Sequence, residues 1–136
     1  MTIKRRKFLK NSLLGALLGG TSYTAFSQPE SKTQIPGKFM HMVFFWLKES
    51  TDLSEFKSST AALMNAIPEV VSYHVGEPAG TPREVVDNSY SVCLIATFKS
   101  KEDQDKYQID PIHEAYVQKN NDKWNKVQIY DSWNGN

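Results

Sequence analysis

The 136-residue sequence contains a single cysteine, Cys93, and no apolar run long enough to span a membrane. One cysteine excludes an internal disulfide and a cysteine-rich zinc site. The weakly apolar stretch over residues 13–25 is shorter than the ~20 residues that a transmembrane helix needs. There is also no Gly-x-Gly-x-x-Gly loop, no P-loop and no serine nucleophile elbow. The common phosphate-binding and serine-hydrolase motifs are therefore excluded.

The sequence has little net charge, but its charges are unevenly distributed. Residues 1–27 hold five of the 16 Lys and Arg residues and none of the 15 acidic residues. The remaining 109 residues hold 11 basic and 15 acidic residues, which is a net charge of −4. A mildly acidic domain has no basic surface for phosphate backbones, so we expect no nucleic-acid partner.

The basic N-terminus has the layout of a bacterial export signal. A basic cluster at residues 4–7 precedes the weakly apolar run and then small residues up to Ser27. Residues 4–10, Lys-Arg-Arg-Lys-Phe-Leu-Lys, resemble the twin-arginine signal, with Lys4 where Ser or Thr is usual. We therefore predict that residues 1–27 are a signal peptide cleaved before Gln28, and that the protein is periplasmic or secreted. The alternative is an uncleaved N-terminal anchor, but we expect no stable membrane anchor.

The rest of the chain predicts a linker and one domain, residues 28–37 and 38–136. Residues 39–47 are apolar on both alternating faces, which indicates a strand covered on both sides. Asp52 or Thr51, Ser100 and Asp110 are candidate helix caps, and Pro68 ends the first helix. The predicted elements are strands at 39–47, 69–76, 89–99 and 127–133, and helices at 53–67, 101–109 and 110–120. The order β-α-β-β-α-β predicts an α+β, ferredoxin-like fold with a four-stranded antiparallel sheet.

This fold leaves one face of the sheet without a helix. By strand parity the uncovered face carries Met40, Met42, Phe44, Trp46, Cys93, Ile95 and Tyr130. Such an apolar patch exceeds what a monomer tolerates. We therefore predict a homodimer in which two sheets pack face to face and close a dimeric α/β barrel.

Candidate chemistry centres on His113, in the first turn of the last helix. Tyr107 lies six residues before it, and Trp124 lies on its helical face if the helix continues that far. A neutral histidine beside a tyrosine hydroxyl in an apolar cleft suits proton transfer. The alternative is that both side chains only pack. No histidine spacing suggests a metal site, and His74 falls on the opposite face of its strand from Tyr73.

Several segments resemble one family, the stress-response dimeric α/β-barrel domain proteins. They are residues 41–45 of the first strand, Ile67-Pro68, Gly76, residues 96–98, and Tyr107-x-x-Asp110-Pro111-x-His113 leading to Trp124. The family usually has His-Pro-x-His, so Asp110 replaces its first histidine. The resemblance implies a homodimer that needs no organic cofactor.

The resemblance also implies a site. A plant polyketide cyclase of this family uses a Tyr and a His, which fall on Tyr107 and His113, in an apolar cleft. The matching pocket wall is His41, Leu94, Trp124, Val127 and Ile129, and a further pocket tyrosine falls on Thr60. The expected function is lyase- or cyclase-like acid–base chemistry on a small apolar carbonyl compound. The alternatives are a non-catalytic, stress-protective or ligand-binding dimer, and a cofactor-free monooxygenase.

Overall fold

The computed structural model describes residues 31–135, and the predicted signal peptide therefore lies outside the described residues. Residues 31–38 contain no helix or strand. The elements are β1 (Phe39–Leu47), α1 (Leu53–Ala66), β2 (Ser72–Gly76), β3 (Val92–Phe98), α2 (Lys101–Gln108), α3 (Pro111–Asn120) and β4 (Trp124–Trp133). This order confirms the predicted ferredoxin-like α+β fold, with the second helical segment divided into two helices.

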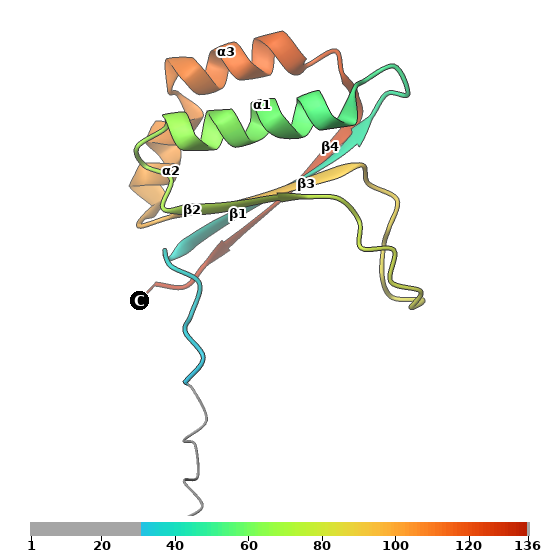
Figure 1. Cartoon of the computed structure of the whole chain (residues 1–136). Helices are drawn as coiled ribbons and strands as arrows, with labels where there is room; N and C mark the ends of the chain where they lie inside the picture. The colour runs from blue at the N-terminus through green and yellow to red at the C-terminus, as the bar shows by residue number, and fades with distance from the viewer. Residues whose placement is uncertain (1–30, 136) are drawn as a thin grey trace, which may run out of the picture. The chain divides into compact units, whose positions relative to one another are not determined.

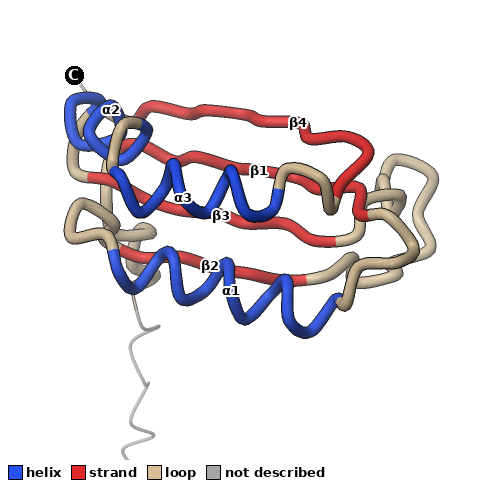
Figure 2. The backbone as a smooth tube through the Cα atoms, turned by 90° about the horizontal axis from the view of Figure 1, so that it is seen from above, coloured by secondary structure: helices blue, strands red, loops and turns tan. Residues whose placement is uncertain are grey.

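The four strands form one antiparallel sheet in the order β2-β3-β1-β4. All three helices lie on the same side of this sheet, and α1 and α3 run next to each other along it (Figures 1 and 2). The other side carries no helix among residues 31–135; the segment before β1 and the long connection between β2 and β3 lie there (Figure 1). The sheet therefore has a helix-covered face and an open face, as predicted.

Strand β1 lies at the centre of the sheet and separates two sets of side chains. His41, Val43 and Phe45 point to the helices and are at most 5% exposed. They pack in a core with Phe56 and Leu63 of α1. A sheet buried on its helix face fixes the strand register, because a shift of one residue would turn these side chains to the open face.

The helix boundaries follow from side-chain caps, as the sequence predicts. The Asp52 carboxylate accepts a hydrogen bond from the Glu55 amide at 2.8 Å, and the Ser100 hydroxyl accepts one from the Asp103 amide at 3.1 Å. The Asp110 carboxylate accepts one from the Ile112 amide at 2.7 Å, and Pro111 begins α3. This cap turns the chain between α2 and α3.

Three predicted strands begin at other residues in the structure. Strand β4 begins at Trp124 instead of residue 127, because Trp124 pairs with Leu47 beyond a register shift in β1. Strands β2 and β3 begin about three residues later than predicted; at the start of β2 the Val70 amide closes a turn onto Ile67. Within residues 31–135, no helix combines the length and apolarity of a membrane-spanning segment.

Candidate functional site

A cavity of about 310 Å³ lies between the sheet and helices α2 and α3. It is bordered by all seven side chains predicted from the sequence: His41, Leu94, Tyr107, His113, Trp124, Val127 and Ile129. Trp124 lines the cavity from the start of β4, because α3 already ends at Asn120. Trp124 therefore borders the cavity from β4 and not, as the sequence suggested, from a continuation of the last helix.

Tyr107 is positioned by its packing in the core. Its side chain is 2% exposed, and its ring lies 5.2 Å from that of Phe98 and 5.8 Å from that of His41, between centroids. Its hydroxyl forms no hydrogen bond within residues 31–135. The hydroxyl oxygen is also not fully buried. Burial raises the pKa of the phenol well above its ordinary value. Tyr107 therefore stays protonated and has a free hydrogen-bond donor.

His113 lies against Tyr107, with ring centroids 4.4 Å apart. Its Nδ1 is 3.2 Å from the backbone carbonyl of Gln108, which can only accept a hydrogen bond. The neutral ring therefore carries its proton on Nδ1 and has a lone pair on Nε2. Burial lowers the pKa of His113 below its ordinary value, so the ring is neutral at pH 7 and can act as a base.

His41 is the second histidine of the cavity, and its orientation is fixed by Asp131. The two residues lie opposite each other on β1 and β4, and His41 Nδ1 is 2.7 Å from Asp131 Oδ1. Donation to a carboxylate places a proton on Nδ1. In the neutral ring, Nε2 is then a hydrogen-bond acceptor. Asp131 was not predicted from the sequence. It lies two residues after Ile129 and four after Val127 in β4, so strand alternation places its carboxylate on the same, helix-covered face.

Tyr116 of α3 is a second polar residue that the sequence analysis missed. It borders the cavity, and its hydroxyl lies 2.7 Å from Oγ1 of the fully buried Thr60. Thr60 is the position onto which the resemblance places a pocket tyrosine. Here a phenol reaches this position from α3 instead of α1. Tyr116 lies three residues after His113, a spacing that puts both on one helical face.

The cavity combines an apolar wall with a few polar atoms. Among residues 31–135, no Lys, Arg, Asp or Glu lines it, and most lining side chains are aliphatic or aromatic. A free phenol and a neutral imidazole can together polarise a carbonyl and remove a proton from the adjacent carbon. Residues 31–135 contain no group of three His, Cys, Asp or Glu side chains arranged to bind a metal.

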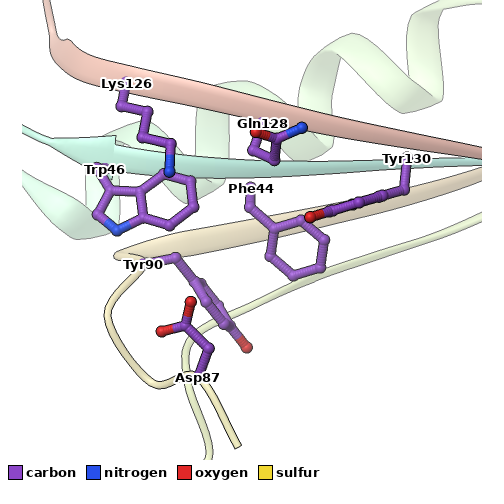
Figure 3. A pocket seen from close by; sticks show the side chains of 7 residues that line it. All are labelled: Phe44, Trp46, Asp87, Tyr90, Lys126, Gln128 and Tyr130. Atoms are coloured by element: carbon purple, nitrogen blue, oxygen red, sulfur yellow. The ribbon is translucent and has the colours of Figure 1, made fainter.

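A second hollow, of about 390 Å³, lies on the open face of the sheet. Figure 3 shows its aromatic side chains from β1 and β4 facing Tyr90 and Asp87 of the β2–β3 connection. The Phe44 ring lies 5.0 Å from that of Tyr90, and Lys126 Nζ lies 4.1 Å from the centre of the Trp46 ring. Cys93, expected on this surface, is only 7% exposed and lies opposite Phe44 in the sheet.

The fold and the cavity define a class of protein: a ferredoxin-like domain with a cavity under its helices and an apolar sheet face on the other side. The sequence model of the stress responsive A/B barrel domain matches residues 39–134. The chain belongs to this family. No curated protein matches its sequence.

Solved structures with the same fold include proteins from plants and bacteria. A protein of Arabidopsis thaliana is 22% identical with a TM-score of 0.62, covering 72% of this chain and 96% of its own. The hydroxynitrile lyase of Passiflora edulis is 18% identical with a TM-score of 0.63, covering 73% and 94%. A dimeric ferredoxin-like protein of unknown function from Thermobifida fusca is 17% identical with a TM-score of 0.60, covering 75% and 96%.

Proposed function

We propose that this protein is a lyase- or cyclase-like enzyme that performs acid–base chemistry on a small, neutral carbonyl compound. The observation that carries the proposal is the contact between Tyr107 and His113 in an apolar cavity. Their pKa values move in opposite directions, which leaves a protonated phenol beside a neutral imidazole. Groups with these properties are suited to act as hydrogen-bond donor and base at neutral pH.

In the proposed reaction the substrate carbonyl oxygen accepts a hydrogen bond from the Tyr107 hydroxyl. His113 Nε2 removes a proton from the carbon next to the carbonyl, and the electron pair of that C–H bond moves toward the oxygen. The phenol stabilises the resulting enolate, and the imidazolium returns the proton or delivers it to a leaving group. The described part of the chain places no charged residue in the cavity lining, which favours a neutral substrate over a phosphate or carboxylate.

The test is proton exchange in heavy water with acetophenone, a small ketone whose methyl protons can be removed. We expect wild-type protein to accelerate deuterium incorporation, measured by proton NMR. Loss of a general base costs about 10²–10⁴-fold in rate, so His113→Gln should remove most of the acceleration. Tyr107→Phe should also reduce it strongly.

The matched control is His74→Gln, which changes an exposed histidine of β2 whose strand position faces away from the helices. It should exchange at the wild-type rate. If the wild-type protein binds ketones but never exchanges their protons, the cavity binds ligands without catalysis and the enzyme proposal fails. Equal rates for His113→Gln and wild type would also refute it.

We also propose that the protein is a homodimer that pairs its sheets through Met40, Met42, Phe44 and Trp46. These four β1 side chains lie on the open face, next to Tyr130, which is 57% exposed. A second sheet at about 10 Å would remove these side chains from water. The dimeric ferredoxin-like protein from Thermobifida fusca supports the dimeric state, whereas the choice of interface rests on the open face of this chain.

Finally, we propose export to the periplasm or the cell exterior by the twin-arginine route, as a sequence-based inference. The supporting feature is the Arg5-Arg6 pair ahead of the weakly apolar run. Replacing both arginines with lysine should retain the full-length chain in the cytoplasm, measured by cell fractionation. If this double variant is still exported, the signal does not use the twin-arginine route.

A further inference from the structure

Tyr116 borders the cavity, and its hydroxyl is committed to one hydrogen bond with Thr60. Thr60 Oγ1 lies 2.7 Å from the backbone carbonyl oxygen of Phe56 and 2.7 Å from the Tyr116 hydroxyl oxygen. A carbonyl oxygen has no proton, so the Thr60 hydroxyl must donate to it. Thr60 has only one hydroxyl proton. Tyr116 must therefore donate its own proton to Thr60.

Because its proton is donated to Thr60, the Tyr116 hydroxyl cannot donate a hydrogen bond to a ligand. Its oxygen keeps lone-pair capacity and can only accept a hydrogen bond from the cavity. Tyr107 is the opposite case, because its hydroxyl proton is free. Both tyrosines border the same cavity. The cavity is therefore bordered by one phenol that donates and one phenol that accepts.

We infer that the physiological substrate carries a hydroxyl group in addition to its carbonyl, and that this hydroxyl donates a hydrogen bond to Tyr116. The inference rests on the proposed function, which places the carbonyl at Tyr107. A methoxy group in place of the hydroxyl could not donate and would leave its oxygen facing that of Tyr116. Tyr116 is thus a specificity-determining residue that selects neutral hydroxy-carbonyl compounds.

The test compares dissociation constants of acetophenone with those of its 3′- and 4′-hydroxy and methoxy derivatives, measured by calorimetry. A neutral hydrogen bond contributes about 0.5–1.5 kcal/mol, so one hydroxy isomer should bind up to about tenfold more tightly than acetophenone. Tyr116→Phe should remove this preference. Tyr73→Phe is the matched control, because Tyr73 bonds Asn65 and does not border the cavity.

Thr60→Val provides a second variant of nearly the same shape. It removes the acceptor of the Tyr116 proton, so Tyr116 becomes able to donate to a ligand. We expect the preference for hydroxy over methoxy derivatives to fall about fivefold in Thr60→Val, because the methoxy oxygen can now accept. A tyrosine that only packs would not produce this change in selectivity.

Two results would overturn the inference while the proposed function stands. One is equal affinity of the wild-type protein for acetophenone and its hydroxy derivatives, together with normal proton exchange. The other is an unchanged hydroxy preference in Tyr116→Phe. If the wild-type protein neither binds nor exchanges any of these ketones, the proposed function fails and the inference fails with it.

Discussion

The two tyrosines of the cavity make a matched pair for separating stability from activity. Tyr107→Phe removes a hydroxyl that forms no hydrogen bond within residues 31–135. Tyr116→Phe removes a hydroxyl bonded to Thr60 at 2.7 Å. Both changes keep the aromatic ring, so neither creates a large hole in the core. We expect only the second change to destabilise the protein.

The magnitudes follow from these contacts. Loss of a neutral intramolecular hydrogen bond costs about 0.5–1.5 kcal/mol, so Tyr116→Phe should lower the free energy of unfolding by about 1 kcal/mol. A hydroxyl buried without a partner opposes folding by about 1–3 kcal/mol in mutational data. The Tyr107 hydroxyl is not fully buried, so solvent can offset part of this penalty. Tyr107→Phe should therefore leave the free energy unchanged or raise it by up to about 1 kcal/mol.

The assay is urea unfolding followed by tryptophan fluorescence, at one fixed protein concentration because dimerisation affects apparent stability. With a slope of about 1–2 kcal/mol per molar urea, Tyr116→Phe should unfold at a midpoint about 0.5–1 M lower. Tyr107→Phe should be as stable as wild type and inactive in proton exchange. If Tyr107→Phe is destabilised as much as Tyr116→Phe and exchange is unaffected, Tyr107 is a structural residue and the proposed chemistry is wrong.

Three further predictions concern the interface, the pH response and the backbone. Phe44→Glu should weaken the dimer on the order of 100-fold or more in sedimentation experiments, because the carboxylate would be buried in the interface. Ile109→Glu is the control and should not weaken the dimer, because Ile109 is 72% exposed. A Phe44→Glu dimer of wild-type strength would refute the interface. Burial lowers the pKa of His113, so the unfolded chain binds its proton more readily. Stability should therefore fall as the pH drops below about 6.5, and the fall should be smaller in His113→Gln in urea titrations across this range. Gly37→Ala should destabilise the protein more than Gly80→Ala in thermal unfolding. Both glycines have positive φ, but only at Gly37 would the new Cβ clash, at 2.9 Å from Thr97 Cβ.

Most of the fold follows from local sequence signals. The apolar run of residues 39–47, the Asp and Ser caps, and the Asp110-Pro111 break each specify an element whose structure agrees. The strand ends were less predictable because they depend on partners elsewhere in the chain. Trp124 joins β4 only because Leu47 pairs with it, and no local pattern contains this information.

The wall of the cavity was predictable from the family resemblance, but the hydrogen bonds of the cavity were not. The contacts His41–Asp131 and Thr60–Tyr116 join residues 90 and 56 positions apart. They depend on the strand register and on how α1 and α3 pack, which periodicity alone does not determine. Only the three-dimensional structure therefore shows which groups of the site donate hydrogen bonds and which accept them.

Strand β1 has a consequence for how ligand binding and assembly influence each other. Val43 and Phe45 border the cavity, while Met42 and Phe44, their direct neighbours in the chain, belong to the proposed dimer interface. Ligand binding and dimerisation would therefore take place on opposite faces of the same strand. If a ligand shifts β1 and changes the dimer affinity by some factor, dimerisation must change the ligand affinity by the same factor. The apparent dissociation constant of the ligand would then depend on protein concentration, and would take different values below and above the concentration at which the dimer forms.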